Sequence, residues 1–211
     1  MEFTYERENG TEKYEGYEWD NVWIDRAKNL ERNRVLYIGD SISCGTRRVA
    51  TLRSEEQILF DGFGTSKGLD NPFFCDAIAL FAKQEARRDA VLFNNGLHGW
   101  HLEDSTEYKA YYEKMVQFLI SFFPDTPVFL VLSSYLADPE RNARVLARNE
   151  AVISLAEKYH LKVIDVYAVT EKMPEKQTDG VHFNSEGYEA IADKLLTFLK
   201  ENVDAFNEVH L

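Results

Sequence analysis

The chain has 211 residues, of which 45% are hydrophobic, and it carries a formal net charge of −12. This length and composition fit one domain with a sizeable core. The acidic balance argues against partners that require clustered Lys and Arg, namely nucleic acids and anionic membrane surfaces. We therefore expect a single acidic domain that binds neither nucleic acid nor membrane.

The N-terminus and the cysteines bear on the compartment. Residues 1–6 contain no basic segment followed by an apolar stretch, so they do not resemble a signal peptide. No apolar run approaches membrane-spanning length. Cys44 and Cys75 form neither a metal-binding nor a disulfide pattern. The simplest expectation is a cytoplasmic protein with reduced thiols, and a leader removed from the N-terminus stays open.

The first 33 residues precede the regular pattern of the chain. Residues 1–18 are polar, acidic and rich in Tyr, which indicates an irregular arm. An amphipathic helix is then predicted from apolar residues at helical spacing, which are Trp19, Val22, Trp23, Ala27 and Leu30. We expect both tryptophans to pack this helix on the domain or on a partner subunit, and a platform for a sugar ring is the alternative.

Five short apolar runs follow, at residues 34–38, 57–63, 90–94, 127–132 and 161–166. Nearly continuous apolar runs are typical of strands buried on both faces of a parallel sheet. Helical patterns lie between them, and Asn71-Pro72 and Asp138-Pro139 each place an N-cap residue before a first-turn proline. The alternation predicts an α/β fold, a three-layer α/β/α sandwich with a five-stranded parallel sheet. The predicted division is an arm and helix at 1–33 and the main domain at 34–211.

Two short motifs near the ends of the chain suggest chemistry. Ser41 directly follows the first predicted strand, and Asp179 stands three residues before His182, ahead of the last helix. Ligands of open parallel sheets bind beyond the carboxyl ends of the strands, where these residues should meet. A serine hydroxyl needs a base in contact, and the base needs an orienting group. We interpret Ser41, His182 and Asp179 in these three roles. The alternative is a helix-capping serine and a loop histidine bonded to a neighbouring carboxylate.

The motif Gly39-Asp40-Ser41-Ile42, followed far downstream by Asp179-x-x-His182, resembles the SGNH (GDSL-like) hydrolase family of esterases and lipases. The resemblance spans about residues 34–200. It implies a flavodoxin-like SGNH hydrolase fold, a Ser-His-Asp triad and no cofactor. In the family's pattern Asp40 supports the turn and does not join the triad.

The resemblance also implies an oxyanion hole. The Ser41 backbone N–H is one donor, and the family's glycine after the second strand falls at Gly64. The family's third motif, Gly-x-Asn-Asp after the third strand, falls at residues 96–99, which we call the third block. It departs from the pattern, because His98 stands at the asparagine position counted from Gly96. An imidazole N–H can donate to an oxyanion, so His98 is our first choice, and Asn95 stays open as the alternative.

Three further residues are candidates for roles around this site. Arg47 follows the nucleophile turn and is a candidate contact for an anionic substrate group, with a solvated surface position as the alternative. Tyr135 follows the fourth strand at the same edge, where it either lines the pocket or packs over it. His98-x-x-His101 has no evident third ligand, so we expect neither a metal nor a cofactor.

The chain is short and has no long apolar segment to serve as a lid, which favours a small acyl group. Our first expectation is therefore an esterase that removes an acetyl group from a carbohydrate. A short-chain lipid esterase or thioesterase is the alternative among enzymes. A carbohydrate-binding protein with a disabled site is the alternative from another class, since fold alone does not guarantee activity. The expected partner is a small-molecule or glycan ester, and a homo-oligomer stays open.

Overall fold

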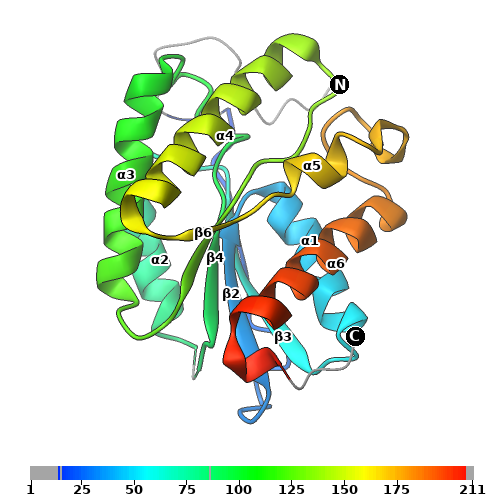
Figure 1. The fold of residues 1–211 in the computed structure, drawn as a ribbon. Coiled ribbons are helices and arrows are strands. Elements are labelled where there is room, and N and C mark those ends of the chain that lie inside the picture. The colour runs from blue at the N-terminus through cyan, green and yellow to red at the C-terminus, as the bar shows by residue number, and fades with distance from the viewer. Residues whose placement is uncertain (1–13, 15, 86, 208–211) are drawn as a thin grey trace.

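The computed structural model describes residue 14, residues 16–85 and residues 87–207. In this part of the chain one six-stranded sheet lies between two layers of helices (Figure 1). The strands are β1 Asp20–Trp23, β2 Asn33–Gly39, β3 Ile58–Thr65, β4 Ala90–Phe93, β5 Val128–Val131 and β6 Lys162–Ile164. The helices are α1 Ser41–Arg53, α2 Phe74–Ala82, α3 Ser105–Phe122, α4 Pro139–Tyr159, α5 Tyr167–Thr170 and α6 Ser185–Asn202, with short 3₁₀ helices η1 Pro174–Lys176 and η2 Asp204–Phe206.

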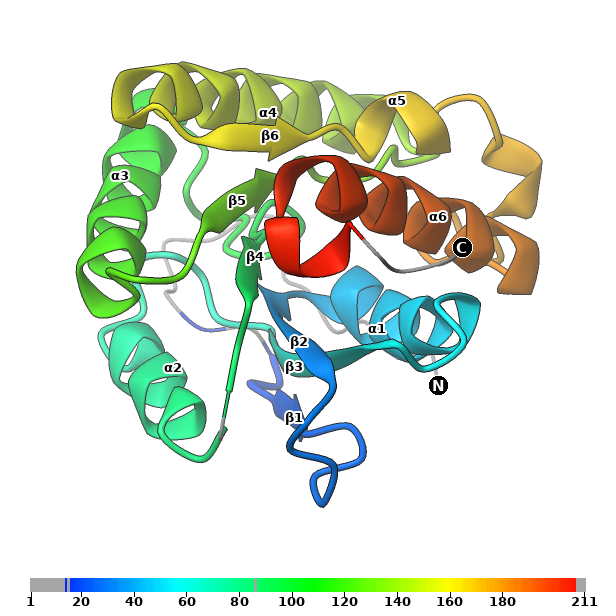
Figure 2. The ribbon, with the colours of Figure 1, turned by 60° about the horizontal axis from the view of Figure 1, so that its bottom comes forward.

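The strand order is β1-β3-β2-β4-β5-β6, and the strands from β2 to β6 pair in parallel. Figure 2 shows α1 and α6 on one face of the sheet and α2 and α3 on the other. The predicted α/β/α sandwich is confirmed. None of the helices within the described residues is long and apolar enough to cross a membrane.

Alternate residues of each central strand enter different cores. Val35 and Tyr37 of β2 pack in the core beneath α1 and α6, whereas Leu36 and Ile38 pack in the core beneath α2 and α3. All four are almost fully buried. Because helices cover both faces, these four consecutive positions are all apolar, instead of every second one. This arrangement explains why the five parallel strands were visible in the sequence.

The predicted helix between Trp19 and Leu30 is wrong. Residues 20–23 form β1, which pairs antiparallel with β3 at the edge of the sheet, and turns follow it. β1 satisfies the outer backbone groups of β3, and this pairing prevails over the helical spacing of the apolar side chains. The sheet therefore has six strands, one more than predicted. Residues 1–13 and 15 of the predicted arm lie outside the described residues.

One of the two predicted helix caps is confirmed, because Asp138 caps α4 by accepting from the Arg141 N–H at 2.8 Å. Asn184 caps α6 in the same way, by accepting from the Gly187 N–H at 3.0 Å. Asn71 accepts instead from the Phe73 N–H at 3.0 Å in the turn that precedes α2. The helix consequently begins two residues later than the Asn71-Pro72 pattern predicts.

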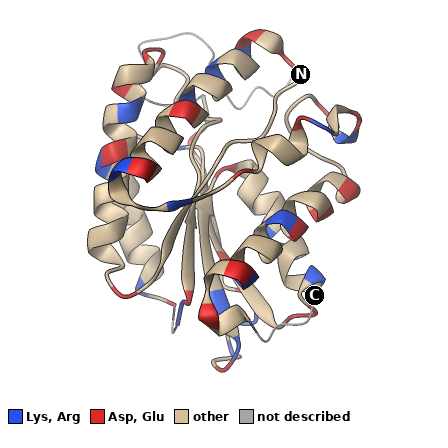
Figure 3. Ribbon diagram, viewed as in Figure 1, with Lys and Arg blue, Asp and Glu red and all other residues tan. Residues whose placement is uncertain are grey.

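Charged residues lie mainly on the helices and loops, while the central strands are almost free of them (Figure 3). Arg34 and Asp61 are exceptions, with 2% and 0% of their surfaces exposed. Arg34 Nη1 donates to both carboxylate oxygens of Asp61, at 2.8 and 2.9 Å. Its Nη2 donates to the carbonyls of Arg26 and Asn29. This buried pair therefore ties the connection between β1 and β2 to the sheet.

Candidate active site

Ser41 occupies a sharp turn from strand to helix. β2 ends at Gly39 and α1 begins at Ser41, so Asp40 alone separates them. Asp40 caps α1 by accepting from the Ile42 N–H at 2.9 Å. The first N–H groups of a helix have no partner within it, and they carry the positive end of its dipole. The local sequence thus places a hydroxyl beside backbone donors at the carboxyl edge of the sheet.

Ser41, His182 and Asp179 form a continuous chain of contacts. Ser41 Oγ lies 2.8 Å from His182 Nε2, across 141 residues of sequence. On the far side of the ring, His182 Nδ1 lies 2.7 Å from Asp179 Oδ2. A proton on Nδ1, held by the carboxylate, leaves Nε2 able to accept from the serine hydroxyl. The side chains of His182 and Asp179 are 37% and 55% exposed, so solvent and small molecules can reach them.

Asp179 also shapes the loop that carries the histidine. Its Oδ1 accepts from the backbone N–H groups of Val181 and His182, at 3.0 and 2.7 Å. Partial burial raises the pKa of Asp179, but the hydrogen bonds from the His182 ring and from these two N–H groups outweigh it. The pKa of this carboxyl therefore lies below its usual value. Asp179 is therefore charged at neutral pH and holds the His182 ring in one orientation through Nδ1.

Tyr135 lies beside the same loop. Its carbonyl accepts from Gln177 Nε2 at 2.8 Å, and its N–H donates to Thr170 Oγ1 at 3.0 Å. Its half-buried ring meets Tyr167 edge to face, with centroids 6.3 Å apart. The backbone of Tyr135 thus supports the loop before His182. A contact between its ring and substrate stays a prediction.

His98 lies close to the nucleophile turn, on the loop that follows β4. Burial raises the pKa of Asp40, and the nearby His98 ring is the strongest of the opposing influences. His98 is itself 3% exposed, and its ring meets Trp19 edge to face with centroids 5.8 Å apart. The structure therefore brings the unusual third-block histidine near Asp40, the residue before Ser41. Donation from His98 to an oxyanion stays a prediction.

Asn95 joins two loops at this edge. Its Nδ2 donates to the Lys67 carbonyl at 2.9 Å, and its own carbonyl accepts from the Tyr108 hydroxyl. One N–H of the amide is therefore already committed to the loop after β3. The role of Asn95 as an oxyanion donor also stays a prediction, now with a competing structural role.

Gly64 does not have the position that its predicted role requires. It lies within β3, opposite Asn21 of β1, and not in the loop beyond the strand. Ser66 N–H donates to the Trp19 carbonyl, so the next hydrogen-bonded pair of this antiparallel ladder is Gly64 with Asn21. That alternation directs the Gly64 N–H toward β1 and away from Ser41. This orientation was not expected, because residues 20–23 were predicted to be part of a helix.

A family model described as the GDSL-like Lipase/Acylhydrolase family matches residues 37–190. The chain belongs to this family. It is therefore a hydrolase that acts on ester bonds. A search of curated protein sequences found no significant match.

Solved structures of the same fold include three with informative names. A member of the lipolytic G-D-S-L family from Veillonella parvula is 19% identical, with a TM-score of 0.62 over 78% of this chain and 96% of that one. The C-terminal catalytic domain of peptidoglycan O-acetyltransferase A from Streptococcus pneumoniae is 21% identical, with a TM-score of 0.61 over 81% and 94%. The acetyl xylan esterase AlAXEase is 17% identical, with a TM-score of 0.59 over 79% and 99%. At these identities the likeness establishes the fold of this family member.

Arg47 does not lie where a substrate contact was expected. It is 5% exposed, and it donates to the Asn21 carbonyl at 3.1 Å and to Asn21 Oδ1 at 2.6 Å. Its guanidinium also lies over the Trp23 ring, 5.9 Å from the centroid. Arg47 therefore fastens α1 to β1, which fits neither the substrate-binding role nor the solvated alternative. Both expectations failed because β1 was not predicted, and the polar groups of Asn21 in β1 bind the guanidinium.

His101 has a partner of its own. Its Nε2 lies 3.0 Å from Asp70 Oδ1, and both side chains are largely buried. Within the described residues no group of three or more His, Cys, Asp or Glu side chains is arranged to hold a metal ion. His101 thus belongs to a pair that links the third-block loop to the turn before α2.

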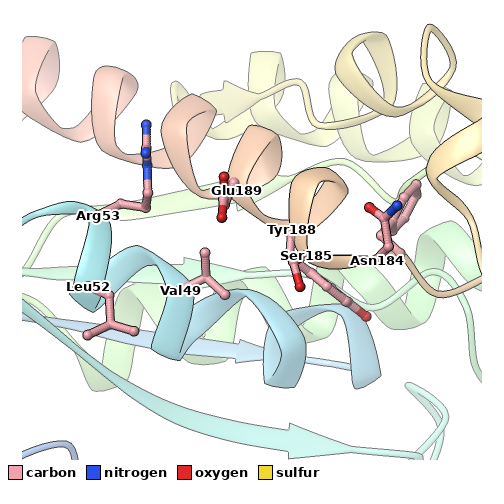
Figure 4. A pocket seen from close by; sticks show the side chains of 8 residues that line it. Val49, Leu52, Arg53, Asn184, Ser185, Tyr188 and Glu189 are labelled. Atoms are coloured by element: carbon pink, nitrogen blue, oxygen red, sulfur yellow. The ribbon is translucent and has the colours of Figure 1, made fainter.

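A groove of about 460 Å³ lies between α1 and α6, beside His182 (Figure 4). Val49 and Leu52 line it from α1, and Phe183 and Tyr188 line it from the other side. Tyr188 extends toward α1 and packs on Gly45, where an added Cβ would lie 2.3 Å from the tyrosine ring. Ser41, Gly45 and Val49 share one face of α1, so the groove continues the line of the helix away from the nucleophile.

Sequence reasoning misplaced one residue of this region and missed another. Trp19 was expected to pack a helix on the domain or on a partner, with a sugar platform as the alternative, whereas it lies half-buried against His98. Arg148 was not singled out, although it lies beneath the third-block loop and is 3% exposed. A signal for Arg148 was present, because it shares the buried stripe of α4 with Val145 and Val152. A charged residue in such a stripe needs partners in the interior.

Proposed function

We propose that this family member is a serine esterase that removes a small acyl group, acetyl, from a carbohydrate, with Ser41, His182 and Asp179 as its triad. The observation that supports the triad is the contact chain of 2.8 Å from Ser41 Oγ to His182 Nε2 and 2.7 Å from His182 Nδ1 to Asp179 Oδ2. Both distances suit proton transfer from the hydroxyl to an oriented imidazole.

The proposed reaction has two halves. Ser41 Oγ attacks the ester carbonyl while His182 Nε2 takes the hydroxyl proton, and Asp179 stabilises the resulting imidazolium. The tetrahedral intermediate collapses as His182 gives this proton to the leaving alkoxide, which departs as the sugar alcohol. Water then attacks the acyl-enzyme with His182 again as base, and Ser41 leaves with the proton restored. The acetate is released as the acid product.

The oxyanion of each intermediate needs positive groups in front of Ser41. The Ser41 N–H at the start of α1 is one candidate, and the dipole of α1 acts in the same direction. The His98 imidazole is the candidate for the position of the family's asparagine. Its closeness to Asp40 supports this choice over Asn95, whose amide is bonded to the Lys67 carbonyl.

Trp19 supports a carbohydrate as the substrate. β1 runs antiparallel to β3, so Trp19, just before β1, lies at the carboxyl edge of the parallel strands, near the triad. It is half-buried beside His98, and an aromatic ring there offers an apolar face to a sugar. Two proteins of the same fold are also named for acetyl groups on glycans, an acetyl xylan esterase and a peptidoglycan O-acetyltransferase.

The test is acetate release from acetylated xylo-oligosaccharides, compared with p-nitrophenyl esters of increasing chain length. We expect acetyl esters to be the best substrates and Ser41→Ala to abolish turnover. Trp19→Ala should raise KM for the oligosaccharide by about tenfold while changing p-nitrophenyl acetate little, because only the glycan needs the aromatic face. Binding of acetylated glycan without turnover by the wild-type chain would support the disabled carbohydrate-binding protein instead.

The groove beside α1 favours a second candidate, a short-chain lipid esterase or thioesterase. Val49, Leu52 and Phe183 offer an apolar surface to an acyl chain that runs along α1 from Ser41, and Tyr188, which packs on Gly45, must turn aside to admit it. In that case butyryl and hexanoyl esters would be hydrolysed faster than acetyl esters, and Leu52→Asp would remove the preference. A rate that falls steadily with chain length contradicts this candidate and supports the deacetylase.

A further inference from the structure

Arg148 lies under the third-block loop and binds it at four points. It projects from α4 and is 3% exposed. Its Nη1 donates to the carbonyls of Gly96 and His98, at 3.0 and 2.8 Å. Its Nη2 donates to the carbonyls of Gly99 and Leu102, at 2.8 and 3.2 Å. One guanidinium thus gathers four backbone oxygens within a stretch of seven residues.

Two aromatic rings hold this guanidinium in place. Its central carbon lies 4.8 Å from the Trp100 centroid and 4.6 Å from the Tyr108 centroid. Trp100 belongs to the bound loop, and the Tyr108 hydroxyl donates to the carbonyl of Asn95, just before it. Both rings are about 1% exposed, so the cation contacts are desolvated and correspondingly strong.

The four hydrogen bonds from Arg148 fix the orientation of the peptide groups in the loop. In a trans peptide the C=O and the next N–H point in opposite directions. Because the Gly96 and His98 carbonyls point at Arg148, the N–H groups of Leu97 and Gly99 point away from it. Gly99 adopts φ +64°, and a side chain there would lie 3.0 Å from the Gly68 backbone. The loop is therefore held from below by Arg148 and bounded on another side by Gly68.

We propose that Arg148 is a positioning residue for catalysis, which sets the third-block loop so that the His98 imidazole faces the oxyanion formed at Ser41. This inference rests on the proposed function, because it acts through His98. A lysine could not do the same, since its ammonium is a point charge, whereas the planar fork of arginine reaches carbonyls in pairs. Displacing a catalytic donor by about 1 Å can cost roughly a hundredfold in rate.

The first experiment compares Arg148→Lys with Arg141→Lys. Arg141 lies over the same Trp100 ring at 4.8 Å, so the control makes the same arginine-to-lysine change on the same ring. For Arg148→Lys we expect kcat on p-nitrophenyl acetate to fall about 10–100-fold with KM nearly unchanged, because the oxyanion donor matters most in the transition state. Arg141→Lys should keep kcat within about threefold of wild type, because Arg141 is only half-buried and the lysine keeps its positive charge.

A double-mutant cycle tests whether Arg148 acts through His98. If it does, Arg148→Lys combined with His98→Ala should be no slower than His98→Ala alone. Fully multiplied effects of the two substitutions would overturn the proposal. So would normal kcat in Arg148→Lys, or a loss of kcat that disappears when rates are corrected for the folded fraction measured by circular dichroism.

Arg148→Ala with added guanidinium, far below denaturing concentrations, supplies an independent readout. Partial recovery of kcat is expected, because the small cation can fill the vacated site between the two rings, and the absence of recovery in a folded variant contradicts the proposal. If Arg148→Ala does not fold, the proposal is tested by the double-mutant cycle of Arg148→Lys and His98→Ala alone. Failure of the proposed function is distinguishable, because the wild-type chain would then hydrolyse no ester at all.

Discussion

Two groups of polar residues lie at and within the centre of the sheet, and they differ in burial. Ser41, His182 and Asp179 lie just beyond the carboxyl end of β2, with His182 and Asp179 partly exposed. Arg34 and Asp61 lie within β2 and β3 and are almost fully buried, with Glu85 packed nearby. We call Arg34, Asp61 and Glu85 the buried cluster.

The two groups respond to their surroundings in opposite ways. At the edge, hydrogen bonds to the charged form lower the pKa of Asp179. In the buried cluster, burial and the charge of Asp61 raise the pKa of Glu85 to about 8. Partial exposure leaves a carboxylate charged and accessible to a reacting partner, whereas burial makes its charge a cost that the fold must offset. We therefore expect changes at the edge to affect turnover and changes in the buried cluster to affect stability.

The largest expected effect is on turnover. Ser41→Ala should lower kcat/KM for p-nitrophenyl acetate by roughly 10⁴–10⁶-fold, because the nucleophile is removed. The thermal midpoint should hardly change, since Ser41 is only half-buried. Rates and calorimetry on the same samples check both expectations. Ser105→Ala, at an exposed serine at the start of α3, is the control and should retain full activity.

Breaking the buried pair should instead lower stability. Asp61→Asn leaves the Arg34 guanidinium buried without its carboxylate, which should reduce the free energy of unfolding by about 3–5 kcal/mol. Urea denaturation measures this change. Asp193→Asn removes one partner of the exposed Arg53–Asp193 pair and should have little effect. Equal destabilisation by the two substitutions would show that burial does not decide the worth of these pairs.

The next prediction concerns which side chain of the third-block loop donates to the oxyanion. His98→Ala should lower kcat by roughly 10²–10³-fold, the usual loss for one oxyanion donor, with a much smaller change in KM. If Asn95 is the donor, Asn95→Ala will show that loss and His98→Ala will be mild. Near-normal turnover in both variants would mean that backbone donors alone form the hole, contrary to our assignment.

Counted per unit of pH, the smallest expected effect is that of Glu85 protonation on stability. Glu85 binds its proton more tightly in the folded chain, where its pKa is about 8, than in the unfolded chain, where it is about 4.3. Its contribution is therefore fully present below about pH 4.3 and is lost as pH rises toward 8, by at most about 1.4 kcal/mol per pH unit. Glu85→Gln should flatten this fall in the thermal midpoint. An unchanged profile would mean that Glu85 titrates normally.

The parallel sheet and the motif positions could be read from the sequence for physical reasons. Strands covered by helices on both faces must be apolar throughout, so five of them stood out as continuous runs. Ser41 follows one such run directly, and Asp179 and His182 are only three residues apart, so local geometry leaves little freedom. The cap at Asp138 was equally local.

What the sequence alone determined is thus what short-range physics controls: strand burial, helix caps and the order of the motifs. Tertiary structure decided the rest. Residues 20–23 form β1 because the edge of β3 has backbone groups left to pair. That pairing directs the Gly64 N–H away from Ser41. It also places Asn21 where it accepts from Arg47. Arg148 met the third-block loop 46–52 residues earlier in the chain. No periodicity encodes such contacts, because they depend on which backbone groups a distant segment leaves unpaired.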